Sequence, residues 1–113
     1  MNPLLDLSRS LTVLPVVHGS ADFALQVTRF LTEHPYDCLA VPLPPSFAAP
    51  VEDGVELLPR VSVVVHCEPG PAGGCSIVPL DPCQAVVAAI RQALADGVRR
   101  AWVDLEVECF EAL

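Results

Sequence analysis

Short apolar runs alternate along this chain with segments whose apolar residues recur every three or four positions. Runs of four to eight apolar residues predict buried strands, and the three-to-four spacing predicts helices. The expected strands span residues 11–17, 37–43, 61–67, 75–80 and 99–107, and the expected helices span residues 21–34, 46–58 and 82–96. This βαβαβ(β)αβ order predicts an α/β fold with a mostly parallel sheet and helices packed on it.

Polar, proline and glycine residues mark the ends of the expected helices. Ser20 and Ser46 each precede a helical pattern, and a serine hydroxyl there can accept a first-turn N–H group. Asp81 followed by Pro82 predicts an N-cap and a first helical position, and Gly97 predicts the end of the same helix. The sequence therefore predicts capped helices that each follow an apolar strand.

The domain organisation follows from the same pattern. Residues 1–10 are expected to form an N-terminal arm, and residues 11–113 a single α/β domain. A helix should follow the strand at 99–107 to cover the sheet, yet the sequence ends within a few residues. We therefore expect a domain truncated at its C-terminal end, an incomplete half of a larger domain whose remainder belongs to a longer chain.

Composition and charge exclude several classes of partner. A hydrophobic fraction of 52% and a mean hydropathy of +0.50 exclude a disordered tail. A formal net charge of −8 with scattered basic residues argues against nucleic acid and against an anionic membrane surface. Prolines and charges interrupt every apolar run before it reaches the length of a membrane span. A cytoplasmic protein is expected, and the missing cover and an acidic edge suggest a homo-oligomer.

The chain has five cysteines, at positions 38, 67, 75, 83 and 109, and no CxxC pair. Close ligand pairs are typical of structural zinc sites, so this arrangement does not favour one. Cys67 and Cys75 flank a Gly/Pro turn and could lie opposite each other on a hairpin. The favoured interpretation is nevertheless that reduced cysteines act as small apolar residues in a cytosolic protein.

Candidate chemistry lies where the expected strands end, because ligands of open α/β sheets bind at the carboxyl ends of strands. The polar residues at those positions are His18, Ser20, Ser46, His66, Glu68, Asp81, Asp104, Glu106 and Glu108. Two histidines with several carboxylates suit a divalent metal or general acid–base catalysis.

Within that set, His18 and Asp104 are the candidate catalytic residues, and His18, Asp104, Glu106 and Asp81 are the candidate metal ligands. Asp104 follows an apolar strand segment, where a buried carboxylate would need a partner. Asp104, Glu106 and Glu108 alternate and would share one face of the strand. Simpler roles stay open, since His18 could order its Gly-Ser turn, Asp81 could only cap a helix, and the acidic face could be solvated.

Three stretches resemble the TraB/Tiki/erythromycin-esterase-like (ChaN-like) superfamily: VVHGSADFALQV at 16–27, HPYDCLAVPLPPSF at 34–47, and VPLDPCQAVVAAIRQALADGVRRAWVDLEV at 78–107. The resemblance spans most of the chain and implies a hydrolase-like domain, metal-dependent in some branches of the family, with an unknown small-molecule or peptide substrate. His18 would match the family histidine, and Asp104 the acid of the late strand. The family glutamate after strand two is replaced by Pro42-Leu43-Pro44, which leaves a non-catalytic binding or regulatory module as an alternative.

A second resemblance is local. VVHGSADFA, Pro45-Ser46 and VSVVV are similar to segments of the small cobalt and iron chelatases of tetrapyrrole synthesis. There a histidine before Gly-Ser handles the metal, and His66 would have to be the second histidine. A tetrapyrrole chelatase is therefore the third interpretation.

Overall fold

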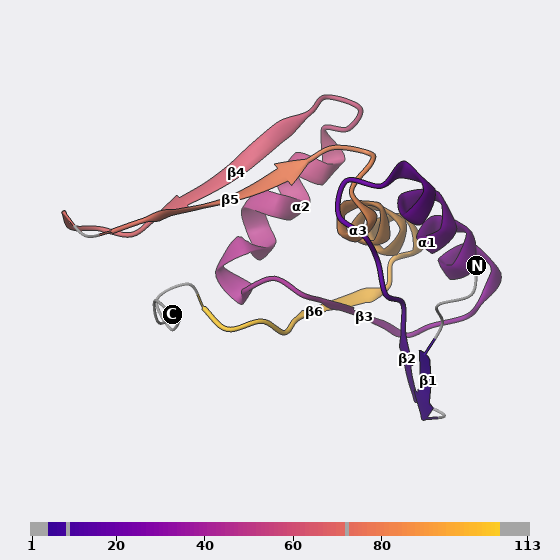
Figure 1. Cartoon of the computed structure of the whole chain (residues 1–113). Helices are drawn as coiled ribbons and strands as arrows, with labels where there is room; N and C mark the ends of the chain where they lie inside the picture. The colour runs from indigo at the N-terminus through magenta and orange to yellow at the C-terminus, as the bar shows by residue number, and fades with distance from the viewer. Residues whose placement is uncertain (1–4, 9, 72, 107–113) are drawn as a thin grey trace.

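The computed structural model describes residues 5–8, 10–71 and 73–106, which form helices and short strands around two small apolar cores (Figure 1). In chain order the elements are β1 (Leu5–Ser8), β2 (Leu11–Val13), α1 (Ala21–Glu33), β3 (Cys38–Val41), the 3-10 helix η1 (Pro45–Phe47), α2 (Ala48–Glu56), β4 (Ser62–Cys67), β5 (Cys75–Leu80), α3 (Ala85–Asp96) and β6 (Arg99–Trp102). No helix among these residues is long and apolar enough to cross a membrane. The predicted α/β class is confirmed.

The strands form three separate two-stranded sheets, so a mostly parallel sheet is not confirmed. The β1–β2 and β4–β5 pairs are antiparallel, and the β3–β6 pair is parallel. The expected strand 11–17 ends at Val13, two residues before Pro15. It pairs antiparallel with residues 5–8, which were expected to form an arm. Proline cannot donate to a ladder, which accounts for the early end and for β2 staying outside the parallel pair.

The first helix agrees with the sequence. The Ser20 hydroxyl accepts a hydrogen bond from the Phe23 N–H at 3.5 Å, as expected for an N-cap. Ala24, Val27 and Leu31 are buried along one stripe, and Pro35 follows the C-cap residue His34. The helix therefore begins, ends and faces the core as its apolar spacing predicts.

The second helix begins differently from the prediction. Pro44 and Pro45 lead into η1, so Ser46 lies inside a 3-10 turn and does not cap α2. Phe47 occupies the N-cap position of α2 without a side-chain hydrogen bond. Pro50 stands in the first turn of α2, where its missing N–H has no intrahelical partner to lose.

The start of α3 also differs, although its end is as predicted. Asp81 does not cap the helix, because α3 begins only at Ala85 and Gln84 is its N-cap residue. The Asp81 carboxylate instead accepts the Cys83 N–H at 2.8 Å, closing a short turn of the kind aspartate favours. Gly97 ends the helix with φ of +66°, a left-handed conformation that glycine adopts without steric penalty.

The helices bury their apolar residues in two clusters that meet at α3. One cluster lies between α2, α3 and the inner face of β5, and it contains Val41, Phe47, Val51, Val55, Leu58, Leu80, Val87 and Ile90. The other lies between α1 and α3 and contains Val27, Leu31, Ala85 and Ala89. Because α3 is covered from two sides, more of its surface is buried than a single stripe would give.

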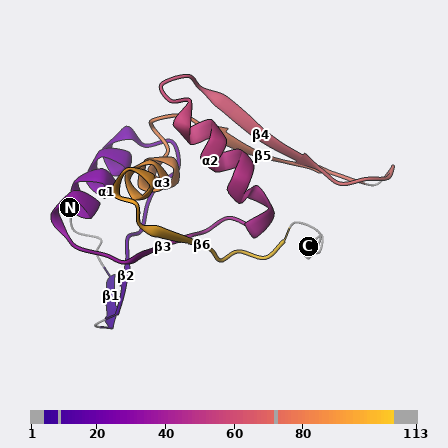
Figure 2. The same cartoon turned by 180° about the vertical axis from the view of Figure 1, so that it is seen from behind.

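A long hairpin, β4–β5, lies over α2 and projects past it (Figures 1 and 2). Cys67 and Cys75 are register partners at its far end and form a disulfide, so the expectation of reduced cysteines is wrong for this pair. The disulfide removes the cysteine argument for a reducing compartment. The hairpin was predicted, but its strands are covered on one face only, with Leu80 buried and Val63 exposed.

Candidate functional site

Two of the predicted site residues lie in neighbouring loops. His18 is exposed in the turn between β2 and α1, and Gly19 in that turn has φ of +75°. The Gly19 N–H donates to Oε1 of Gln84 at 3.0 Å, and Nε2 of Gln84 donates to Oδ2 of Asp81 at 3.3 Å. Gln84 thus connects the turn that carries His18 with the turn that carries Asp81.

The other two predicted residues lie elsewhere. Asp104 and Glu106 follow β6, which ends at Trp102, so they do not share a strand face as predicted. Glu106 accepts the Ser46 N–H at 2.9 Å, and Asp104 is exposed and accepts the Leu105 N–H at 2.8 Å. An exposed carboxylate needs no buried partner, so the argument from burial does not apply to Asp104.

Figures 1 and 2 both show the segment after β6 running beneath α2, away from the turn between β2 and α1. Within residues 5–8, 10–71 and 73–106, no three or more His, Cys, Asp or Glu side chains are grouped so that they could hold a metal ion. The set of His18, Asp81, Asp104 and Glu106 therefore does not fit a single divalent cation in this arrangement. Glu108 lies outside the described residues.

His66, the second histidine of the chelatase interpretation, is half-buried on the inner face of β4. Its ring centroid lies 5.8 Å from that of Phe47, so the ring packs against an aromatic side chain. Cys38 and Cys83 are free and exposed. Among the described candidate histidines, cysteines and carboxylates, only Asp81 is connected to the turn of His18, through Gln84.

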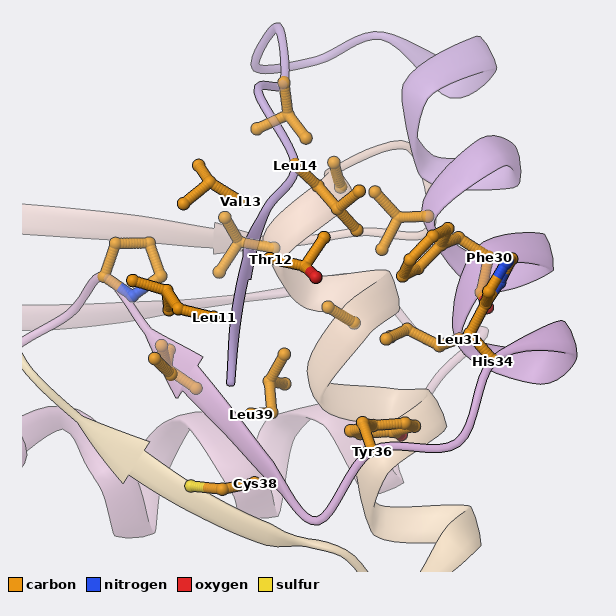
Figure 3. Close-up of a pocket in the computed structure, with 18 of the residues that line it drawn as sticks. Leu11, Thr12, Val13, Leu14, Phe30, Leu31, His34, Tyr36, Cys38 and Leu39 are labelled. Atoms are coloured by element: carbon orange, nitrogen blue, oxygen red, sulfur yellow. The ribbon is translucent and has the colours of Figure 1, made fainter. Parts of the chain in front are cut away.

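A hollow that the sequence did not predict lies between β2, α1, β3 and α3 (Figure 3). Its volume is about 1150 Å³, slightly above the roughly 300–1,000 Å³ of typical small-molecule sites. The lining is mostly apolar and includes Leu11, Val13, Leu14, Val16, Phe30, Leu31 and Leu39. In Figure 3, Leu31 and Leu39 point into the space from α1 and β3.

β2 and β3 belong to different sheets, and the hollow lies between them. Leu14, Val16, Phe30 and Leu39 pack against the α1–α3 cluster but are only partly buried. The sequence predicts a strand over residues 11–17, whereas β2 ends at Val13 and the following residues Leu14 and Val16 line the hollow. The departure at Pro15 is the signal in the sequence that could have indicated the hollow.

Polar groups lie at the rim of the hollow, on the segment after α1. His34 is exposed, stacks on Phe30 with ring centroids 4.1 Å apart, and has Nδ1 3.0 Å from the Phe30 carbonyl oxygen. A carbonyl oxygen can only accept, so Nδ1 carries the proton and Nε2 of neutral His34 is an acceptor. No described residue bonds to Nε2, which leaves it able to accept from a ligand.

Tyr36 also lines the hollow (Figure 3). Its hydroxyl donates to Oδ2 of Asp96 at 3.0 Å, which ties the start of β3 to the end of α3. Burial, followed by the hydrogen bond to Asp96 and the charge of that carboxylate, raises the pKa of Tyr36 to about 12. Tyr36 is therefore neutral at physiological pH and holds the wall of the hollow in place.

Comparisons with known proteins give no assignment: no family model, no curated protein and no solved structure matches this chain. Membership of the TraB/erythromycin-esterase-like superfamily and the hydrolase activity it implies therefore stay predictions. The chelatase interpretation likewise stays a prediction.

Proposed function

We propose that this chain is a binding module that holds an uncharged, mostly apolar small molecule in the hollow between β2, α1, β3 and α3. The observation that carries the proposal is the apolar lining of that hollow, about 1150 Å³ in volume. A well-formed apolar hollow with a few polar groups at its edge is a usual place for a small-molecule site. The proposal follows the non-catalytic alternative and requires no metal.

The lining defines the chemistry of the ligand. Aliphatic side chains such as Leu14, Leu31 and Leu39, together with Phe30, favour an aliphatic or aromatic body, since apolar surface gains by leaving water. Nε2 of His34 favours one hydrogen-bond donor, a hydroxyl or an N–H, at the end nearest the rim. The net charge of −8 disfavours an anionic ligand.

N-phenyl-1-naphthylamine is a suitable probe, because it is uncharged, aromatic and carries one N–H. We expect its fluorescence to rise saturably on titration with the full chain. Leu14→Trp places a larger side chain in the hollow and should weaken binding about tenfold, since the indole occupies space that the probe needs. Unchanged binding to this variant would contradict the proposal.

The matched control is Leu57→Trp, the same substitution at an exposed leucine just after α2 and outside the hollow. This variant should bind the probe like the wild type. Replacing His34 with leucine tests the polar contact, because it removes the acceptor and keeps an apolar side chain. We expect a loss of about two- to tenfold for the probe and little change for anthracene, which has no donor.

A further inference from the structure

The outer face of the β4–β5 hairpin is apolar and uncovered. Val63, Val65 and Ile77 are 53%, 55% and 63% exposed, and they share this face with the disulfide. No residue of β4 or β5 is an acid, a lysine or an arginine, although the whole chain carries a net charge of −8. An exposed, uncharged apolar surface on an acidic protein is typical of an interaction site.

The alternation of hydrogen-bonded and non-hydrogen-bonded residue pairs along the hairpin determines which backbone groups point outward. The Glu68 N–H donates to the Gly74 carbonyl at 3.0 Å, so these two residues form a hydrogen-bonded pair. Hydrogen-bonded and non-hydrogen-bonded pairs alternate along antiparallel strands. The pairs Cys67–Cys75, Val65–Ile77 and Val63–Pro79 are therefore non-hydrogen-bonded, and their N–H and C=O groups point away from the hairpin.

The two outer edges of the hairpin differ. On the β4 edge, Val63, Val65 and Cys67 each present an outward N–H and C=O, and β4 pairs with no strand other than β5 among the described residues. On the β5 edge, Pro79 has no N–H to present. The β4 edge also lacks the lysines, prolines and bulges that protect edge strands. It is therefore the better template for another strand.

We propose that β4 pairs antiparallel with β4 of a second copy of this chain, about a two-fold axis through Val65. In that register Val65 lies opposite Val65 of the second copy, and Val63 lies opposite its Cys67. Every outward donor then meets an outward acceptor, because positions 63 and 67 are equally far from the axis. The product is a four-stranded sheet in which the two apolar faces join on one side.

Charge and strand number favour a second copy as the occupant. Two chains of net charge −8 repel each other, but β4 itself carries no Asp, Glu, Lys or Arg side chain, so pairing along β4 sets no two like-charged β4 side chains opposite each other. A two-stranded hairpin is marginal without further strands, and the far part of this one projects past α2 (Figures 1 and 2). Strand-edge pairing buries less than the about 800 Å² per partner of a standard interface, so the dimer is reversible and concentration-dependent.

Sedimentation equilibrium of the full chain over a range of concentrations tests the proposal, with Val65→Pro as the variant. Proline at residue 65 removes an outward N–H without removing a β4–β5 bond. The matched control is Ile77→Pro, which changes the register partner of Val65 on the opposite edge in the same way. We expect Val65→Pro to weaken dimerisation about tenfold or more and Ile77→Pro to change it less than about twofold.

Three outcomes would overturn the proposal. A wild-type chain that stays monomeric at every concentration has no such dimer. Equal weakening by the two proline variants would show packing through the apolar face instead of the edge. A dimer that persists in folded Val65→Pro would form through another surface.

If a proline variant does not fold, amide hydrogen exchange on the wild type tests in its place whether the dimer forms through the β4 edge. On raising the protein concentration, the amides of Val63, Val65 and Cys67 should become protected, while the outward amide of Ile77 should not. The amides of Val64 and His66 point toward β5 and serve as an internal reference. A dimer that leaves the three outward β4 amides unprotected would contradict pairing at this edge.

Discussion

The three helices, which form the body of the molecule, and the β4–β5 hairpin are all rich in apolar residues but are very differently buried. Ile90 of α3 has no exposed surface, whereas Val65 of β4 is 55% exposed. α3 lies between α1 and α2, so neighbours cover it from two sides, while α2 covers only one face of the hairpin. An apolar run predicts which element forms, but the number of elements that pack on it decides how much of it leaves water.

The largest test of this comparison is truncation to alanine in each region. Ile90→Ala removes fully buried methyl and methylene groups and should lower the free energy of unfolding by about 2–5 kcal/mol. Val65→Ala removes exposed groups and should change it by less than about 0.5 kcal/mol. Urea denaturation measures both, at a concentration low enough to keep the chain monomeric. Similar losses for the two variants would mean that the outer face of the hairpin is covered in solution.

The disulfide offers a second and smaller test, because it constrains the hairpin alone. Cys67 and Cys75 are eight positions apart, and closing so short a loop stabilises a chain by about 2–3 kcal/mol in the chain-entropy view. Replacing both with serine should speed amide exchange in β4 and β5 and leave α1 and α3 nearly unchanged. Cys38→Ser is the control, since that thiol is free and exposed. Faster exchange throughout the helices would show that the hairpin and the body unfold as one unit.

The helices could be predicted because local signals and burial agree in them. Ser20, Gly97 and the apolar spacing of α1 each act through residues close in the chain. The starts of α2 and α3 were displaced because a local alternative competed: the Pro44-Pro45 pair begins a 3-10 turn, and Asp81 closes its own short turn. Sheet pairing depends on residues far apart in sequence, and the parallel β3–β6 pair joins segments separated by two helices and a hairpin.

The site was harder to predict than the fold. Listing polar residues at strand ends assumes one sheet edge where they meet, and three separate two-stranded sheets offer none. The turns of His18 and Asp81 come together through Gln84, which gave no signal of its own, and Ser46 bonds Glu106 in a different place. The hollow borders β2, which pairs with neither β3 nor β6. An apolar pattern predicts a strand but does not show which other strand it pairs with. In the sequence, the apolar residues that line the hollow cannot be told apart from residues of the core.

The smallest expected effect concerns the hydrogen bond between Tyr36 and Asp96. It tests the helical body separately, because neither residue belongs to the β4–β5 hairpin. Tyr36 is the one tyrosine in the sequence, so absorbance at alkaline pH follows its ionisation without overlap from another phenol. Its pKa, raised to about 12 by burial and by Asp96, should fall toward the usual value near 10 in Asp96→Asn, and burial should hold it somewhat above that value. A midpoint that does not move would mean that Asp96 contributes nothing to the shift.

The sign of the linked pH dependence follows from that raised pKa. The folded chain holds the phenol proton more tightly than the unfolded chain, so the contribution of Tyr36 is complete below about pH 10 and is lost as the pH rises toward 12. Tyr36→Phe should remove this alkaline dependence and cost about 0.5–1.5 kcal/mol at neutral pH, the usual value of one hydrogen bond. Because Tyr36 forms part of the wall of the hollow, binding of the naphthylamine probe should weaken over the same alkaline range in the wild type and not in Tyr36→Phe. Loss of binding over that range in both proteins would place the titrating group elsewhere in the body.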